Sequence, residues 1–568
     1  MPNLSRNAAD GARTPSSASA AGAAGSVRDR PTAGSPFGAS AKSGEHFATG
    51  TVDGRTRASA LRSTAWFRLR LIPWLARGWI CQLRWVGLLA VTLLGGSSTV
   101  AARPPARPNV VFILADDLGW GDLGCYNRAS KIPTPRLDRL AAEGLRFTDA
   151  HSPSAVCTPT RYGLLTGRYA WRTRLTNGVL WGYSRPLIEP DRLTVASLLR
   201  QHGYATACIG KWHLGLGWPT TGPAPTGAAA LADAKPAEVD FTQPFSAGPH
   251  TVGFDYSYVL PGSLDMEPYV FVENGRVDGV PTNSVAGSKS QRQGGAGFWR
   301  GGPASPGFTH EGCQPKFAAK AVEFIRRQTT ERPFFLYLPL TSPHDPWLPT
   351  PEFKGRSAAG ARGDFVMQVD ATVGQILDAL KAAGFDRNTL VFFSSDNGAH
   401  WLPDEAKRTG HAANGPWRGM KSDAWEGGHR VPLLARWPGV IRPGRSSSAL
   451  VGLNDLTATL AELLGAQLPA NAAEDSRSFL GPLRGSRRAD REPLVLHSID
   501  GVFALRQGPW KFIAAPGSGG WTKGKVPGPV QLYDLRADPA EARDRAGAEP
   551  KRVQAMAATL ERIRAGRP

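Results

Sequence analysis

From Asn109 onward, short apolar runs alternate with segments whose apolar residues recur at helical spacing. Four runs have strand length and no polar alternation: 109–117, 204–210, 333–340 and 389–398. Such runs are typical of parallel strands that are covered on both faces. Helices are expected at 134–147, 193–203, 315–328, 364–384 and 454–465, with a further strand at 431–439. The alternation predicts an α/β fold built on a large mixed, mostly parallel sheet flanked by helices.

The two ends of this pattern differ from its centre. We predict a catalytic α/β domain over 109–485 and a smaller C-terminal α+β subdomain over 490–568. The latter has strand-like pieces at 493–499, 502–513 and 530–535 and a final helix at 553–564. Two Gly-, Pro- and Ala-rich stretches, about 215–250 and 275–315, predict long loops over the carboxyl ends of the strands.

The N-terminal segment is predicted to be a leader sequence. Residues 1–60 are low in large apolar groups and predict a disordered, low-complexity extension. Residues 61–102 carry arginines, then an apolar run over 86–94, then small residues that end at Ala101 and Ala102. This order predicts a signal peptide and a secreted or periplasmic protein, with an uncleaved anchor as the alternative. The run is short for a membrane span, so no stable span is expected.

The net charge of +20 on 568 residues does not indicate a nucleic-acid-binding protein. Residues 1–108 hold 14 Lys and Arg against 4 Asp and Glu, which is half of the excess. We expect no nucleic-acid partner, since no zinc-finger spacing or basic-aromatic repeat is present; a mildly basic surface suits anionic substrates. The five cysteines show no CxxC spacing. One disulfide among Cys125, Cys208 and Cys313 stays open, although buried free thiols are favoured.

Polar residues follow several of the predicted strands directly: Asp116, Asp117, Lys211, His344, Asp396 and Asn397. Ligands of open α/β sheets bind at the carboxyl ends of the strands, so these residues are expected to converge. The carboxylates and the amide are hard oxygen ligands suited to calcium or magnesium, and calcium is preferred because it tolerates irregular cages. Taken singly, Asp-Asp could instead cap a helix and Asp-Asn-Gly could form a turn.

The segment CTPTR at 157–161 places Cys157 at or near the start of a predicted helix. A helix N-terminus favours negative charge, which would stabilise a thiolate or an alkoxide there. Arg161 lies one turn later, where its planar guanidinium could hold an anion.

CTPTR and six further segments resemble the type I sulfatases, which belong to the alkaline-phosphatase-like superfamily. In chain order these are NVVFILADDLGWGDLGCYN, GKWHLG, SPHDPW, SSDNGAH, RGMKSDAWEGGHRVP and LYDLRADPAEARD, between Asn109 and Asp544. Thr160 stands where many relatives carry serine, and a contact from the segment with Ser263 and Asp265 is not carried over.

The resemblance implies a formylglycine made from Cys157 by a formylglycine-generating maturation enzyme. It implies the catalytic residues Cys157, Arg161, Lys211, His213, His344 and Lys421. It also implies one calcium ion held by Asp116, Asp117, Asp396, Asn397 and the modified residue 157. Glu426 and Arg430 are predicted to form a structural ion pair outside catalysis.

The activity that the resemblance implies is hydrolysis of the sulfuric ester of a sulfated carbohydrate or an aryl sulfate. The hydrated aldehyde would attack sulfur, with Asp396 as proton acceptor and His213 as acceptor for the second hydroxyl. Arg161 and Lys211 would stabilise the sulfate oxygens, and His344 and Lys421 the leaving oxygen. Alternatives are a phosphonate or phosphate ester hydrolase of the same superfamily and a non-catalytic sulfated-glycan-binding protein.

Overall fold

The computed structural model describes residues 107–222, 232–290, 292, 297–486 and 493–566. The predicted extension 1–60 and the predicted signal region 61–102, with Ala101 and Ala102, lie outside these residues. Across the described ranges, no helix is both long enough and apolar enough to cross a membrane.

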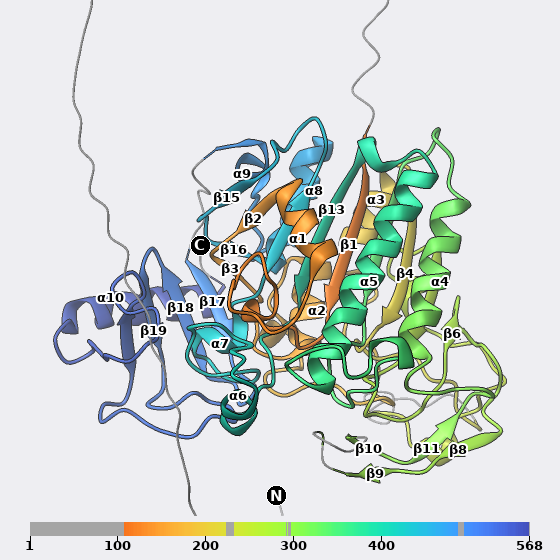
Figure 1. Ribbon diagram of the computed structural model, residues 1–568, viewed down its shortest axis with the longest axis horizontal. Coiled ribbons are helices and arrows are strands. Elements are labelled where there is room, and N and C mark those ends of the chain that lie inside the picture. Colours follow the sequence, from red (N-terminus) through yellow and green to blue (C-terminus); the bar gives the residue numbers. More distant parts are fainter. Residues whose placement is uncertain (1–106, 223–231, 291, 293–296, 487–492, 567–568) are drawn as a thin grey trace, which may run out of the picture. The chain divides into compact units, whose positions relative to one another are not determined.

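A ten-stranded sheet forms the larger domain, in the order β15-β2-β14-β13-β1-β12-β4-β5-β6-β7 (Figure 1). Five neighbouring strands are parallel: β13 (Thr389–Ser395), β1 (Asn109–Ala115), β12 (Phe334–Pro339), β4 (Ala205–Lys211) and β5 (Tyr256–Leu260). The outer strands are β14 (Leu433–Arg436), β2 (Leu145–Phe147), β15 (Arg445–Ser447), β6 (Val272–Glu273) and β7 (Arg276–Val277). They join the parallel set through the antiparallel pairs β13–β14 and β5–β6. The predicted mixed, mostly parallel sheet is confirmed.

Helices cover both faces of this sheet. Val111 and Ile113 of β1 belong to a core with α1 (Pro135–Ala142), α4 (Cys313–Arg326) and α5 (Ala361–Ala382). Val110 and Phe112 belong to the opposite core, whose helices are α2 (Cys157–Thr166), α3 (Val195–Gln201), α8 (Leu456–Leu464) and α9 (Leu480–Arg484). Because successive side chains of a strand point to opposite faces, burial on both sides explains why the run in β1 shows no polar alternation.

One predicted helix is wrong at its C-terminal end. The stretch 134–147 is not one helix, because α1 ends at Ala142 and β2 begins at Leu145. Gly144 lies between them, where an added Cβ would come within 2.2 Å of the Ala435 carbonyl oxygen. Only glycine allows this close approach, and it lets β2 pair with β14.

The predicted loop at 275–315 contains secondary structure. It carries β7 and four further short strands: β8 (Asn283–Val285), β9 (Ser288–Lys289), β10 (Phe298–Trp299) and β11 (Gly302–Ala304). They form the pairs β8–β11 and β9–β10 beyond the carboxyl ends of the parallel strands (Figure 1). Strands of two or three residues are too short to leave a period-two signal in the sequence.

A second sheet forms the predicted C-terminal subdomain. Its antiparallel strands are β17 (Leu494–His497), β18 (Phe503–Gln507), β19 (Trp510–Ile513) and β20 (Gln531–Asp534), so the single predicted piece 502–513 is a hairpin of two strands. Helix α10 (Pro550–Arg564) packs on one face through Met556 and Leu560. The other face packs on Ala424 and Trp425 of the larger domain.

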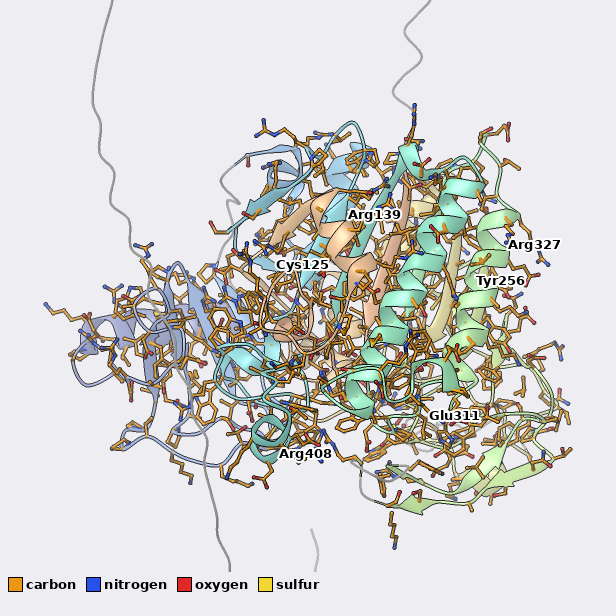
Figure 2. All side chains as sticks on the ribbon, viewed as in Figure 1. Cys125, Arg139, Tyr256, Glu311, Arg327 and Arg408 are labelled. Carbon is orange, nitrogen blue, oxygen red and sulfur yellow. The ribbon has the colours of Figure 1, made fainter. Side chains whose placement is uncertain are left out.

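Cys125, Cys208 and Cys313 are free thiols, as the sequence favoured, and Cys157 likewise forms no disulfide with a described residue. Cys157, Cys208 and Cys313 are buried, and Cys125 is half-buried. Figure 2 labels Cys125 among the side chains of the larger domain.

Candidate active site

The polar residues predicted for the site lie together at one edge of the sheet. They follow the parallel strands: Asp116 and Asp117 come directly after β1, Lys211 ends β4, Asp396 and Asn397 follow β13, and His344 lies in the loop after β12. Hydrogen bonds join them; the backbone N–H of Asp117 donates to Oδ1 of Asp396 at 3.2 Å. Residues spread over about half of the chain therefore form one cluster.

Cys157 is the first residue of α2 and is buried. Its sulfur and carboxylate oxygens of Asp116 and Asp396 lie within 4.8 Å of one another. Burial raises the pKa of the Cys157 thiol, although Lys211 and Lys421 act in the opposite direction. At this position burial therefore acts on the pKa in the opposite direction to the helix start.

Arg161 lies one turn further along α2 and is fully buried. Its Nε and a terminal nitrogen donate to Oδ2 of Asp396 at 3.0 and 2.7 Å, and the other terminal nitrogen donates to the Lys211 carbonyl oxygen at 2.9 Å. The guanidinium thus ties α2 to β13 and β4 as well as bringing positive charge to the site.

Two lysines each neutralise one aspartate. Nζ of Lys211 donates to Oδ2 of Asp116 at 2.6 Å, and Nζ of Lys421 donates to Oδ2 of Asp117 at 2.8 Å. Burial opposes the charge of Lys421, but Asp117 raises the pKa of its ammonium above the ordinary value. Lys421 therefore stays protonated while its side chain is only 7% exposed.

The two histidines have defined ring orientations. Nε2 of His213 donates to the Leu180 carbonyl oxygen at 2.7 Å, and its buried Nδ1 meets no hydrogen-bond partner in the part of the chain that the structure describes. Burial and Lys211 hold the pKa of His213 well below its usual value, so Nδ1 carries a free lone pair. Nδ1 of His344 donates to the Asp345 carbonyl oxygen, which leaves Nε2 facing Asp117 at 3.8 Å from Oδ2. Burial and Lys421 also lower the pKa of His344.

The oxygen atoms fit a hard cation. Oδ1 of Asp116 and Oδ1 of Asn397 are buried and have no hydrogen-bond partner among the described residues. A buried oxygen without a donor is costly unless a ligand satisfies it. Nδ2 of Asn397 donates to Oδ1 of Asp117 at 2.7 Å, which orients the amide oxygen. The donor set of carboxylates and an amide oxygen is that of calcium or magnesium sites.

Two supporting residues were missed by the sequence reasoning. Oγ of Ser263 accepts from Lys211 at 3.1 Å, in the segment that was not carried over from the resemblance. Arg362 donates to the Asp117 carbonyl oxygen at 2.8 Å and also binds Asp122. Asp117 has a positive φ of 64°, a strained conformation that such contacts hold in place. No local pattern distinguishes Arg362 from other arginines on a helix.

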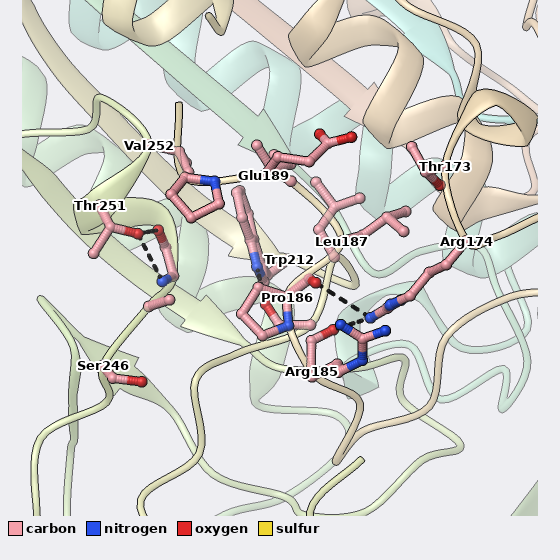
Figure 3. A pocket seen from close by; sticks show the side chains of 16 residues that line it. Thr173, Arg174, Arg185, Pro186, Leu187, Glu189, Trp212, Ser246, Thr251 and Val252 are labelled. Atoms are coloured by element: carbon pink, nitrogen blue, oxygen red, sulfur yellow. Dashed lines mark hydrogen bonds between the residues drawn. The ribbon is translucent and has the colours of Figure 1, made fainter. Parts of the chain in front are cut away.

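A separate pocket lies behind the Lys211–His213 segment (Figure 3). It has a volume of about 590 Å³ and is lined in part by Trp212, Pro186 and Leu187. Arg174 donates to the Arg185 and Pro186 carbonyl oxygens, so its guanidinium is already engaged. Among the described residues that line this pocket, none belongs to the predicted catalytic set.

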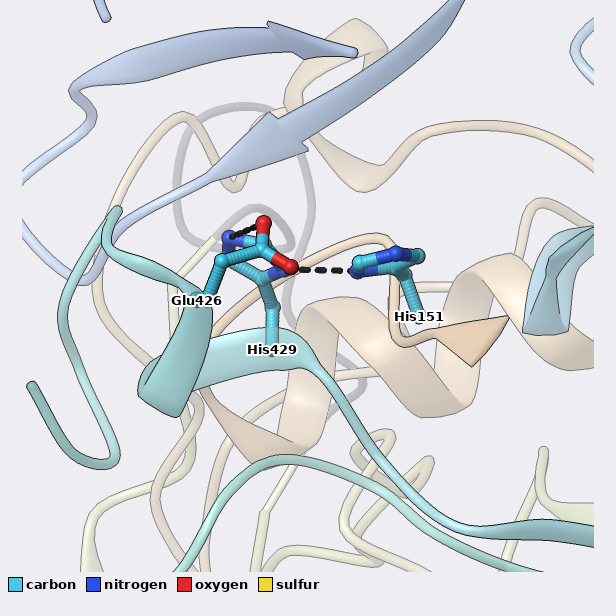
Figure 4. A group of neighbouring side chains, drawn as sticks. All are labelled: His151, Glu426 and His429. Atoms are coloured by element: carbon cyan, nitrogen blue, oxygen red, sulfur yellow. Dashed lines mark hydrogen bonds and ion pairs between the residues drawn. The ribbon is translucent and has the colours of Figure 1, made fainter. Parts of the chain in front are cut away.

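A second buried charge cluster lies where the two sheets meet, and we call it the interface cluster. It consists of Asp149, His151, Glu426, His429, Arg430, Arg506, Lys511 and Glu541. His151, Glu426 and His429 point toward one another like metal ligands (Figure 4). However, Nζ of Lys511 lies 2.9 Å from Nε2 of His429 and 3.2 Å from Oε1 of Glu426, where a cation would bind. The predicted pair is present, with Arg430 2.7 Å from Glu426.

Comparisons with known proteins agree with these observations. The sulfatase family model matches residues 108–466. The chain is 36% identical over 499 residues to an N-acetylgalactosamine-6-O-sulfatase of Bacteroides thetaiotaomicron, covering 81% of this chain and 93% of that protein. It is 35% identical over 480 residues to human arylsulfatase A, covering 80% and 87% of the two chains.

Solved structures give the same result. A structure from work on the metabolism of multiple glycosaminoglycans by Bacteroides thetaiotaomicron aligns with a TM-score of 0.71 at 35% identity, covering 81% of this chain and all of that one. The PsFucS1 sulfatase from Pseudoalteromonas sp. aligns with a TM-score of 0.62 at 27% identity, covering 81% and 90%.

Proposed function

Because this chain belongs to the sulfatase family and is a sulfatase, we propose that it releases sulfate from a sulfated carbohydrate by means of a formylglycine at residue 157 and one calcium ion. The observation that carries the proposal is the position of Cys157, buried at the start of α2 beside Asp116 and Asp396. The carbohydrate is favoured because a relative at 36% identity is named for a sulfated amino sugar.

The charges of the site suit a calcium ion and a sulfate ester together. Three carboxylates are matched by three basic groups, so a divalent cation and an anionic substrate would enter a site that is already balanced. Asp116, Asp117, Asp396 and Asn397 would hold the calcium, which would lower the pKa of the nucleophilic hydroxyl and polarise the sulfate group.

Asp396 and His213 would act as the proton acceptors. A carboxylate oxygen of Asp396 lies within 4.8 Å of the sulfur of Cys157, within short reach of a hydroxyl at residue 157. His213 presents the lone pair of Nδ1, because Nε2 is fixed on the Leu180 carbonyl oxygen. We assign Asp396 to the attacking hydroxyl and His213 to the second hydroxyl of residue 157.

Lys421 and His344 would act on the leaving oxygen, and Lys211 and Arg161 on the other sulfate oxygens. Lys421 carries its proton at Nζ. His344 presents Nε2 on the same side of Asp117, and the negative charge of a bound sulfate ester would raise the pKa of its imidazole. Lys211, held by Asp116 and Ser263, would stabilise the sulfate oxygens by charge-assisted hydrogen bonds, with the positive charge of Arg161 behind it.

The first experiment is the mass of the tryptic peptide FTDAHSPSAVCTPTR, from protein made together with a formylglycine-generating enzyme. A thiol-to-aldehyde change at Cys157 and sulfate release from a 6-sulfated amino sugar are the expected results. An unmodified thiol, in cells where a control sulfatase is converted, would contradict the proposal. A faster rate on an aryl phosphonate than on every sulfate ester would contradict the choice of substrate.

We further propose that residues 61–102 direct export, with cleavage near Ala101 and Ala102. The catalytic unit would then begin near Asn109 and extend to about residue 485, followed by the subdomain 490–568. N-terminal sequencing of exported protein is the test, and an N-terminus upstream of residue 61 would contradict the proposal.

A further inference from the structure

The rim of the site carries exposed aromatic side chains. Among the described residues, Trp181, Phe298 and Trp521 are 52%, 39% and 40% exposed. A single exposed aromatic side chain is common on a protein surface, so its contacts decide whether it belongs to a binding surface. The question is whether these three are connected to the catalytic residues.

Contacts connect each of them to the site. Trp181 follows Leu180, whose carbonyl oxygen holds His213. The backbone N–H of Phe298 donates to the carboxylate of Asp345, the neighbour of His344. Trp521 lies closest, because Nζ of Lys421 is 5.9 Å from the centre of its ring.

Trp521 is held firmly although it comes from the C-terminal subdomain. It lies in the connection between β19 and β20, and its backbone N–H donates to Oγ of Ser422 at 2.9 Å. The next residue, Thr522, donates from its backbone to Oδ1 of Asp423 at 3.1 Å. The subdomain is thus docked on the two residues that follow Lys421, so the place of Trp521 relative to Lys421 is fixed by short contacts.

His400 supports the ring from the side of the metal-binding loop. Its imidazole centre lies 4.7 Å from that of Trp521, at an interplanar angle of 53°. His400 follows Asn397 by three residues. The Trp521 ring therefore lies between the loop that carries the cation ligands and the segment that carries Lys421.

The chemistry of the leaving group determines which part of the substrate contacts the Trp521 ring. The ester oxygen that departs from sulfur is an oxygen atom of the alcohol, so the alcohol's own carbon atoms must lie within a few ångströms of the group that protonates it. If Lys421 is that group, the first ring of a sulfated sugar reaches Trp521. The C–H faces of a pyranose are apolar while its edges carry hydroxyls, and a tryptophan offers a large apolar face at low entropic cost.

We propose that Trp521, supported by His400, is the platform on which the pyranose ring of the sulfated substrate packs, so that the C-terminal subdomain supplies part of the substrate site. This inference rests on the proposed function and deepens it. It makes Trp521 a specificity residue for the alcohol part of the ester, separate from the groups that bind the sulfate.

The test compares Trp521→Ala, Trp521→Phe and the unchanged protein, all carrying formylglycine, on a 6-sulfated amino sugar. Loss of the platform is expected to lower kcat/KM for the sugar about tenfold in Trp521→Ala, and phenylalanine is expected to recover most of it. Competitive inhibition by inorganic sulfate should stay within about twofold, because sulfate alone does not reach the ring. An aryl sulfate is a poor control, since an aryl ring could pack on Trp521 as well.

Trp510→Ala is the matched control in the same subdomain. Trp510 lies on β19 and packs under Arg552 of α10, whose guanidinium carbon lies 4.2 Å from the ring centre. Its removal should leave both kcat/KM for the sugar and sulfate inhibition unchanged. Equal losses in Trp510→Ala and Trp521→Ala would overturn the inference, because they would reflect a weakened subdomain.

The outcomes separate the two proposals. A wild-type protein that carries formylglycine but releases no sulfate from any sulfated sugar would overturn the proposed function and, with it, this inference. Sulfate release by the wild-type protein with an unchanged kcat/KM in Trp521→Ala would overturn the platform alone.

Discussion

The active-site cluster and the interface cluster each bury three carboxylates and three basic side chains, yet their oxygen atoms are treated differently. In the interface cluster, Oε1 of Glu426 and Oε1 of Glu541 form ion pairs at 3.2 and 2.9 Å with Nζ of Lys511, although neither accepts a well-aligned hydrogen bond from a described residue. In the active-site cluster, the contact of Oδ1 of Asp116 with Arg161 is longer, at 3.6 Å, and Oδ1 of Asn397 has no hydrogen-bond partner among the described residues.

The difference shows how the same residue types serve two purposes. A buried carboxylate costs free energy unless opposite charge and hydrogen bonds satisfy it. The interface cluster meets this need with the protein's own cations, so it joins the two sheets and leaves no room for a ligand. In the active-site cluster some buried oxygen atoms lack these contacts. A bound cation and an anionic substrate would supply the missing interactions.

Removal of metal by a chelator should show the largest difference between the two clusters. Removing the metal from the active-site cluster is expected to abolish sulfate release, and adding calcium should restore it. Metal analysis should find one ion per chain in the wild-type protein and in Glu426→Gln, and none in Asp116→Asn. A second ion that disappears in Glu426→Gln would show that the interface cluster also binds metal.

Replacing Lys421 should reduce catalysis far more than stability. Lys421→Met removes the protonated amine beside Asp117, and kcat is expected to fall about 10²- to 10⁴-fold, the range for loss of a general acid. The melting temperature of the calcium-bound protein should change little, because the ion can still neutralise Asp117. A kcat within a few-fold of wild type would remove Lys421 from the reaction.

The corresponding substitution in the interface cluster should have the opposite effect. Lys511→Met leaves Glu426 and Glu541 without their shared cation, and breaking such a buried pair costs about 3–5 kcal/mol of unfolding free energy. Chemical denaturation measures this loss, and kcat per folded molecule should remain near wild type. A large loss of kcat without a loss of stability would contradict the division between the clusters.

The smallest effect concerns Glu541 and pH. Burial and the neighbouring Glu426, opposed by Lys511, raise the pKa of Glu541 to about 7. A carboxyl group whose pKa is raised on folding contributes stability that is complete below about pH 4.5 and is lost as pH rises to about 7. This pH-dependent part of the unfolding free energy is on the order of 3 kcal/mol, and it should be absent from the unfolding profile of Glu541→Gln. Parallel profiles of wild type and Glu541→Gln across that range would refute the assignment.

Much of the fold could be predicted from periodicity because the central strands are buried on both faces. The runs that became β1, β4, β12 and β13 are continuous and apolar for this reason. The errors fell where pairing partners lie far away in the sequence. Strand β2 was taken for the end of a helix, because its three residues are stabilised by β14 and β15.

The candidate site also has residues that the sequence predicted and residues that it did not. Asp116, Asp117, Asp396 and Asn397 could be proposed as neighbours because parallel strands end at one edge of a sheet. Ser263 was named without a role and Arg362 was not named, since their contacts with Lys211 and with the Asp117 carbonyl oxygen depend on how distant segments pack.

The sequence by itself determined the class of sheet, the residue types that gather at its edge and the resemblance to the sulfatases, because each depends on local order along the chain. Only the tertiary structure decided which charges are paired. Lys511 pairs with carboxylates of the interface cluster, whereas oxygens of Asp116 and Asn397 in the active-site cluster have no hydrogen-bond partner among the described residues. Trp521 of the C-terminal subdomain lies beside Lys421. The physical reason is that pairing, burial and the proximity of rings depend on distances between segments far apart in the chain.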